Sequence, residues 1–163
     1  MFSTALYSFI CFSIFSSSNV HKQPKDDQVT FTVIYDNYSS SDQFVGDWGF
    51  SCLIEGKEKT VLFDTGTKPE IFRRNLEELK IDISNIDEIV ISHNHGDHTG
   101  GLPVTLEKEE VLPVYIPASV EDNFLNRFYS FQDHTIPVNE PVEICDGIIS
   151  TGEMGSGIKE QSL

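Results

Sequence analysis

The chain has 163 residues, enough for one domain with a hydrophobic core of its own. Apolar residues make up 39% of it, near the globular average, which excludes a wholly disordered chain. Asp and Glu outnumber Lys and Arg by 26 to 11, for a formal net charge of −15. This charge argues against a nucleic acid or an anionic membrane as the main partner and is compatible with a divalent metal ion and a small-molecule substrate.

The first 18 residues carry no charge and form a short apolar segment that ends in Ser16-Ser17-Ser18. A membrane span needs about 20 apolar residues, so the segment better fits the apolar core of a secretory signal, although no basic residue precedes it. We expect a secreted or periplasmic protein, with residues 1–18 as a signal-like segment and residues 19–28 as a linker. The alternatives are an uncleaved anchor, its only link to a membrane, or a cytoplasmic domain.

Two cysteines, Cys52 and Cys145, lie beyond this segment. Two cysteines do not make a disulfide framework, and their separation says nothing about pairing. We predict that both are small, buried, apolar residues.

Beyond the linker, β-branched and aromatic residues predict strands. The first covers Val29 to Tyr35 and is followed by a polar loop, Asp36 to Asp47. A second strand, Trp48 to Glu55, and a third, Thr60 to Phe63, are separated by a short turn and predict a hairpin.

A helix is predicted next, because Thr67-Lys68-Pro69-Glu70 resembles a capping box with proline in the first turn. Apolar residues then follow at helical spacing up to about Lys80, namely Ile71, Phe72, Leu76 and Leu79. The run Ile86 to Ile91 scarcely alternates, so the strand within it, Glu88 to Ile91, is expected to be covered on both faces.

The last third repeats the alternation of strand and helix. Val114 to Ile116 reads as a strand, and Ser119 is predicted to cap a helix. One face of that helix is apolar and is expected to pack in the core, with Phe124, Leu125, Phe128 and Phe131. Strand material returns between Pro141 and Ser150. Strands followed by interleaved helices and strands favour an α/β fold with a mixed sheet.

Directly after the buried run comes His93-Asn94-His95-Gly96-Asp97-His98. Imidazole nitrogen and carboxylate oxygen are good zinc ligands. His93 and His95, two residues apart, can converge on one ion, and Asp97 and His98 can reach a second position about 3.5–4 Å away, as in two-metal hydrolytic sites. The pattern therefore predicts a site for one or two divalent ions, with zinc as the expected metal and manganese or iron as alternatives.

The segment Ser92 to Leu102 resembles the signature loop of the metallo-β-lactamase superfamily, and Val61 to Gly66 is similar to the family's earlier strand-end aspartate motif. The resemblance covers Val29 to Leu163. Within the superfamily it is similar to the dihydropterin-ribofuranosylaminobenzene 5′-phosphate synthase-like branch. The segments that suggest this branch are Trp48-Gly-Phe-Ser51, His93 to Leu102, Ser150-Thr-Gly-Glu153 and Lys159 to Leu163.

The resemblance implies a role for each of these residues. His93 and His95 would bind a first metal ion, and Asp97 and His98 a second. Asp97 would also act in catalysis by orienting a metal-bound hydroxide, which attacks an ester, lactone or phosphoester-type small molecule. Asp64 would support the site from behind the ligands, as carboxylates often do for ligating imidazoles. Its plainer interpretation is an aspartate that opens a turn.

The same resemblance implies a four-layered αββα sandwich of two β/α halves, of which this chain matches the N-terminal half. The second half would supply further metal ligands, beginning with a Gly-Cys-Ser-His-Pro-type motif after a segment like Lys159 to Leu163. After His98 the chain holds one histidine, His134, in no such context. We therefore expect residues 29–163 to be a C-terminally incomplete domain, with two ligands per metal and an exposed apolar sheet face.

Three functions stay open at this point. The chain is expected to belong to a metal-dependent hydrolase. The alternatives are a truncated, non-catalytic remnant with weak or no metal binding, and an iron-dependent oxidoreductase of the same fold. A homo-oligomer that completes the site between two copies is a further arrangement.

Overall fold

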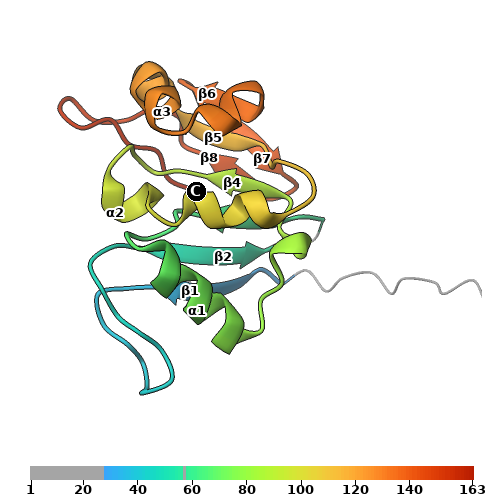
Figure 1. The fold of residues 1–163 in the computed structure, drawn as a ribbon. Helices are drawn as coiled ribbons and strands as arrows, with labels where there is room; N and C mark the ends of the chain where they lie inside the picture. Colours follow the sequence, from blue (N-terminus) through green and yellow to red (C-terminus); the bar gives the residue numbers. More distant parts are fainter. Residues whose placement is uncertain (1–27, 57) are drawn as a thin grey trace, which may run out of the picture.

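The computed structural model describes residues 28–56 and 58–163, and its centre is a six-stranded mixed sheet (Figure 1). The strands follow one another across the sheet in chain order. They are β1 (Thr30–Tyr35), β2 (Ser51–Glu55), β3 (Thr60–Phe63), β4 (Glu88–Val90), β5 (Val114–Pro117) and β6 (Thr135–Val138). The pairs β1–β2 and β2–β3 are antiparallel, whereas β3 to β6 are parallel. The predicted α/β class with a mixed sheet is confirmed.

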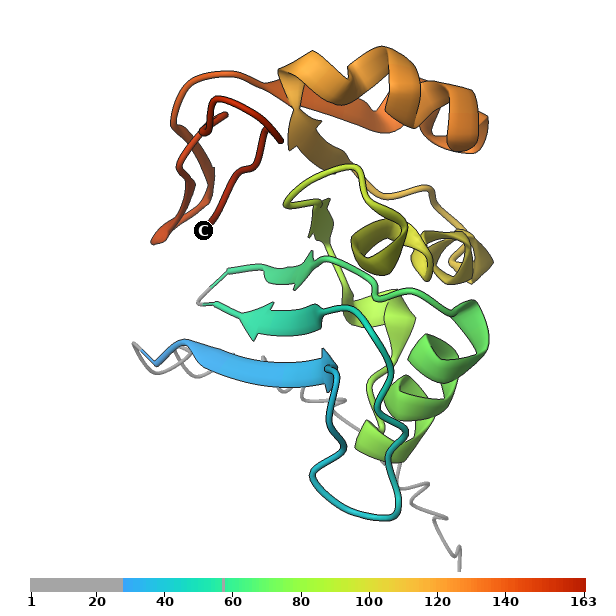
Figure 2. The same ribbon diagram turned by 90° about the vertical axis from the view of Figure 1, so that its left-hand side faces the viewer.

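Helices connect the parallel strands and lie on one side of the sheet, as Figure 2 shows. The α-helices are α1 (Pro69–Leu79), α2 (Gly96–Thr99) and α3 (Glu121–Arg127). Short 3₁₀ helices accompany them: η1 (Ile83–Asn85), η2 (Leu102–Glu107), η3 (Ala118–Val120) and η4 (Tyr129–His134). A separate antiparallel hairpin, β7 (Val142–Cys145) and β8 (Ile148–Ser150), lies on the opposite side.

The helix-covered face holds the main core. Side chains that alternate along the strands point toward the helices, among them Leu53, Leu62 and Ile89. They meet Phe72 of α1 and residues of the later helices, and Leu62, Ile89 and Phe72 are all fully buried. The apolar face predicted after Ser119 does pack in the core. Phe124 and Phe131 are buried, and Leu125 and Phe128 pack against the same core cluster.

The opposite face is only partly covered. Its alternate residues form a smaller cluster with the β7–β8 hairpin: Cys52, Ile54, Val61, Val90, Ile144, Cys145 and Ile148. The hairpin does not cover the sheet near β1. Three apolar residues there are exposed by 42%, 66% and 53%, namely Val29, Phe31 and Val33. A groove of about 500 Å³ runs between this strand and the hairpin. The apolar exposure expected on this sheet is therefore present.

Several local predictions hold and others are wrong. Cys52 and Cys145 are free and buried, as predicted. The capping box is wrong: α1 has Lys68 as its N-cap, without a side-chain hydrogen bond, and the Thr67 hydroxyl donates to the Trp48 carbonyl instead. Ser119 is not the cap of α3 either, because Val120 holds that position.

One strand boundary differs from prediction, and one strand was not predicted. β2 begins at Ser51, because residues 48–50 turn away from the sheet toward α2. The strand β6 was not predicted; it contains Pro137 and lies at the sheet edge, where a missing backbone N–H is tolerated.

The predicted signal-like segment and nearly all of the linker lie outside the described residues. Within residues 28–56 and 58–163, no helix has the length and apolar character needed to cross a bilayer.

Candidate metal centre

The centre is built at the carboxyl ends of two adjacent parallel strands. β3 ends at Phe63 and is followed by Asp64; β4 ends at Val90 and is followed closely by Ser92. In open α/β sheets, polar residues after such strand ends converge at one edge. The backbone N–H of Asp64 donates to the Val90 carbonyl over 2.9 Å, which holds the two strand ends side by side.

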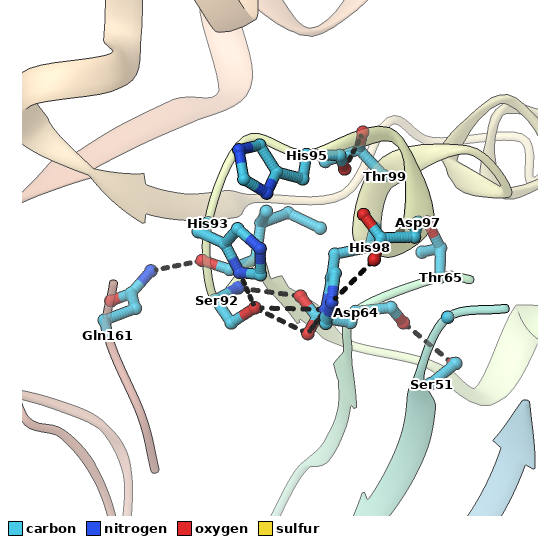
Figure 3. A network of polar contacts seen from close by, with 12 residues as sticks. Ser51, Asp64, Thr65, Ser92, His93, His95, Asp97, His98, Thr99 and Gln161 are labelled. Atoms are coloured by element: carbon cyan, nitrogen blue, oxygen red, sulfur yellow. Dashed lines mark hydrogen bonds and ion pairs between the residues drawn. The ribbon is translucent and has the colours of Figure 1, made fainter. Parts of the chain in front are cut away.

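Asp64 is the buried anchor of the centre, at 1% exposure (Figure 3). Its Oδ1 accepts the backbone N–H of Ser92 over 2.7 Å, and its Oδ2 accepts the Ser92 hydroxyl over 2.7 Å. Oδ2 also lies 2.7 Å from Nδ1 of His98. Its φ of 56° is left-handed, a conformation that aspartate adopts more readily than most residues. These contacts put Asp64 directly behind His98, and its supporting role for a metal ligand stays a prediction.

The structure brings three of the four predicted ligands together. His93, Asp97 and His98 each offer one ligand atom, and these atoms all lie within 4.8 Å of one another. The rings of His93 and His98 have centroids 4.2 Å apart, and Nε2 of His98 lies 3.5 Å from Oδ2 of Asp97. His93 therefore groups with the residues that were predicted to serve the second ion.

His95 lies beside this group but outside it. Its ring centroid is 4.7 Å from that of His93, and it lines a separate hollow of about 330 Å³ with Asn94 and Lys159. Its backbone is the N-cap of α2, where its carbonyl accepts the Thr99 hydroxyl over 2.8 Å. This helical turn rotates Asp97 and His98 back toward His93.

The hydrogen bonds select which ring nitrogen faces the cluster. With Nδ1 of His98 bonded to Asp64, its Nε2 points toward Asp97. The Ser92 hydroxyl donates to Asp64, so its oxygen is free to accept a hydrogen bond from the Nδ1–H of His93, 2.9 Å away. Both imidazoles are thus oriented by groups behind them, the arrangement that commonly supports ligating histidines.

The two histidines have opposite pKa shifts. Burial lowers the pKa of His93, and the nearby His98 lowers it further. Burial also lowers the pKa of His98, but its hydrogen bond with Asp64 and the Asp64 charge outweigh this, and the net shift is upward. His93 is therefore neutral and ready to bind a metal near pH 7, whereas binding at His98 competes with a proton.

Backbone contacts fasten the histidine loop onto the end of β3. The N–H of Thr65 donates to the His98 carbonyl over 2.8 Å, and the N–H of Gly100 donates to the Gly66 carbonyl over 2.8 Å. A Cβ on Gly100 would lie 1.8 Å from the Thr67 carbonyl oxygen, so only glycine allows this approach. The loop and the strand end form one rigid unit.

Comparison with known proteins decides the lineage. The model of the Metallo-beta-lactamase superfamily matches residues 49–161, which include the whole histidine loop and Asp64. The chain belongs to the metallo-beta-lactamase superfamily. This confirms the resemblance inferred from the sequence motifs.

Relatives within the superfamily differ in function. The chain is 36% identical over 97 residues to a 7,8-dihydropterin-6-methyl-4-(beta-D-ribofuranosyl)-aminobenzene-5'-phosphate synthase from Methanocaldococcus jannaschii, covering 56% of this chain and 33% of the synthase. It is 38% identical over 81 residues to an anaerobic nitric oxide reductase flavorubredoxin from Aliivibrio fischeri, covering 48% of this chain and 16% of that protein. The chain thus spans a third or less of the length of these two relatives.

Solved structures show the same fold. A metal-dependent hydrolase of the beta-lactamase superfamily superposes with a TM-score of 0.58 at 22% identity, covering 82% of this chain and 60% of that one. A flavoprotein from Thermotoga maritima superposes with a TM-score of 0.52 at 24% identity, covering 64% of this chain and 26% of that one. The sheet and helices described above therefore match part of a metallo-beta-lactamase fold.

The donor set of this superfamily member fits a divalent ion. Ligand atoms within 4.8 Å of one another are close to the spacing around one ion, whose bonds are about 2.0–2.2 Å long. Imidazole and carboxylate suit zinc, iron and manganese alike, so the donors favour a divalent metal without selecting one.

Sequence reasoning missed the roles of three residues near this superfamily's loop. Ser92 links Asp64 to His93 through its hydroxyl. Gln161, 2% exposed, donates to the carbonyls of Ile91 and Tyr115 and so holds the C-terminal segment against the loop. Trp48 donates its indole N–H to Asp97. All three stood in the quoted motifs, but the contacts of Ser92 with Asp64, Gln161 with Tyr115 and Trp48 with Asp97 cross 28, 46 and 49 positions of sequence and have no local signature.

Proposed function

We propose that this chain carries the metal-binding part of a metal-dependent hydrolase whose substrate is a small ester, lactone or phosphoester. One observation carries the proposal: His93, Asp97 and His98 converge within 4.8 Å, above a buried Asp64 that orients His98. The similarity to a metal-dependent hydrolase in fold supports it. The chain spans a third or less of the length of the two relatives described above. The activity of those relatives is therefore not carried over, and hydrolysis by this protein is itself proposed.

Each residue has a distinct task in this proposal. His93, Asp97 and His98 hold the ion, and His95 lies near enough to take part after a change of side-chain rotamer. Zinc is the first choice, with manganese or iron as alternatives. A bound divalent ion would supply Lewis-acid polarisation of the substrate and an activated water. Asp64 keeps the Nε2 of His98 directed at the ion.

Asp97 has a second task. Its Oδ2 accepts the Trp48 indole and faces His98, which leaves Oδ1 to hold a water molecule by hydrogen bonding. These contacts support the proposal that Asp97 orients the water, the role that the family resemblance implied. The task belongs to the carboxylate itself, so Asp97→Asn should retain part of the metal binding and lose most of the turnover.

Metal binding by the purified chain is the first test. Zinc titration by calorimetry should show saturable binding to the wild type, and His93→Ala should weaken it at least tenfold. His134→Ala is the matched control, because His134 is exposed and lies in η4 beyond α3. Equal affinity of the wild type and His93→Ala would contradict the proposal.

Turnover is the second test, with chromogenic esters, lactones and phosphodiesters as substrates. Metal-dependent hydrolysis that disappears in His93→Ala but persists in His134→Ala would support the hydrolase. Metal binding without turnover of any substrate would support the non-catalytic alternative for this chain.

Iron-dependent redox chemistry is the second candidate, because the flavorubredoxin relative is 38% identical over 81 residues. The protein should be purified without added metal and its metals measured by mass spectrometry. Two iron atoms per chain, with dioxygen consumption in the presence of a reductant, would favour this candidate. Zinc in place of iron would favour the hydrolase.

A further inference from the structure

Trp48 is the single tryptophan of the chain, and it lies at the rim of the metal centre. The residue is 68% exposed, yet its indole N–H donates to Oδ2 of Asp97 over 2.8 Å. A large aromatic ring left mostly in water gains little from burial, so packing alone does not explain its position. The polar contact with a candidate metal ligand does.

The backbone beside Trp48 is held against α2 on one side and against the segment before α1 on the other. The N–H of Phe50 donates to the Asp97 carbonyl over 3.2 Å, and the Thr67 hydroxyl donates to the Trp48 carbonyl. Gly49 has a φ of 135°, and a Cβ there would lie 2.4 Å from the Asp97 carbonyl oxygen. The segment therefore touches Asp97 through its backbone and its side chain, and glycine is required for the close approach.

A hydrogen bond and an ion pair also restrain the backbone on the N-terminal side of Trp48. Its backbone N–H donates to Oδ1 of Asp47 over 2.9 Å, and Oδ2 of Asp47 pairs with Nζ of Lys68 at 2.6 Å. The indole thus starts from a backbone that is anchored at both ends. A donor on so restrained a support can fix the direction of a carboxylate.

We propose that Trp48 is a positioning residue of the metal centre: its indole N–H fixes the Asp97 carboxylate with Oδ2 beside Nε2 of His98, 3.5 Å away. The inference rests on the proposed function. The indole also forms a wall of a hollow of about 250 Å³ that Asp97 and His98 line, and this places it beside the site where a substrate would approach.

Fluorescence tests the contact directly, because all tryptophan emission from the chain comes from residue 48. Titration with zinc should change the emission, and the change should saturate with the dissociation constant found by calorimetry. In Asp97→Asn the same zinc titration should give a smaller or absent change. An emission that stays constant while calorimetry shows zinc binding would overturn the inference.

Affinity tests the positioning role. Trp48→Phe keeps an aromatic ring and removes the donor, and it should weaken zinc binding about 10–100-fold, the usual cost of losing a partner behind a ligand. Incorporation of benzothienylalanine at position 48 replaces only the N–H with sulfur and should give a similar loss. Tyr129→Phe, at an exposed aromatic residue in η4, should leave zinc affinity unchanged.

The outcomes separate the two proposals. If the wild type binds no metal, the proposed function fails and the positioning role fails with it. If the wild type binds zinc and both Trp48 variants, with unchanged circular dichroism, bind it equally well, only the positioning role fails. Loss of affinity in the two folded variants supports both.

Discussion

The two faces of the six-stranded sheet use the same strands and differ in how they are covered. On the helix face, Leu62 and Ile89 are fully buried beneath α1 and the later helices. On the other face, Phe31 and Val33 are 66% and 53% exposed because the β7–β8 hairpin does not reach β1. One face is completed by local connections of the chain, and the other keeps apolar surface open to a further element.

The metal centre depends on the well-covered face. Asp64 and the histidine loop follow strands β3 and β4, whose inner residues are locked into the main core. A rigid strand end is what allows a carboxylate and two imidazoles to be held in fixed relative positions. The centre can therefore be well ordered although the opposite face is partly open.

The largest expected effect is on the covered face. Ile89→Ala removes a fully buried side chain and should destabilise the metal-free protein by about 2–5 kcal/mol, the range for such cavities. The free energy of unfolding from urea titration checks this. A loss below about 1 kcal/mol would show that the helix face is less closely packed than described.

The next effect concerns Asp64, the buried anchor of the metal centre. Asp64→Ala leaves the Ser92 N–H without its acceptor and His98 without its partner. Because His98 is part-exposed and can turn to water, the loss of stability should be about 1–3 kcal/mol, the cost of the one buried donor left unpaired. Zinc affinity should also fall about 10–100-fold. Unfolding titrations and calorimetry measure the two losses separately. Unchanged zinc affinity would assign Asp64 to the turn alone.

A smaller effect is expected from pH in the metal-free protein. The pKa of His98 is raised in the folded state. Its contribution to the free energy of unfolding is therefore complete below the unfolded-state pKa of about 6.5 and is lost as pH rises through the folded-state pKa. The pKa of His93 is lowered, so its contribution is instead lost as pH falls below about 6.5.

Unfolding free energies measured from pH 5 to 8 should therefore fall on both sides of about 6.5 as far as these two groups contribute. His98→Gln should remove the fall on the alkaline side and leave a smaller fall on the acid side, because His98 is one cause of the lowered pKa of His93. A fall above pH 6.5 that persists in His98→Gln would come from other groups and contradict the assignment.

The smallest effect is expected on the open face. Phe31→Thr replaces an exposed apolar side chain with one that also favours strands, and the change in unfolding free energy should stay within about 0.5 kcal/mol. The solution behaviour should change more, because less apolar surface is left for self-association. Light scattering at increasing concentration measures this. A large loss of stability would mean that Phe31 is covered in solution.

Sequence patterns predicted most of the sheet and the position of the centre. β1, β3, β4 and β5 are short β-branched runs, which is why they were found within a residue or two. The edge strand β6 was missed because Pro137 argues against a strand until its place at the edge is known. The caps of α1 and α3 were mispredicted for two reasons: the Thr67 hydroxyl donates to the Trp48 carbonyl in place of a capping contact, and Ser119 lies inside the turn η3 that precedes α3.

The sequence by itself determined the lineage and the ligand types, because the spacing of histidine and aspartate after a buried strand is a local property. The tertiary structure decided which of them meet. The turn of α2 grouped His93 with Asp97 and His98 and set His95 aside. Asp64 and Trp48 reach the same cluster from 34 and 49 positions away, and only the packing of strand ends brings such residues within hydrogen-bonding distance.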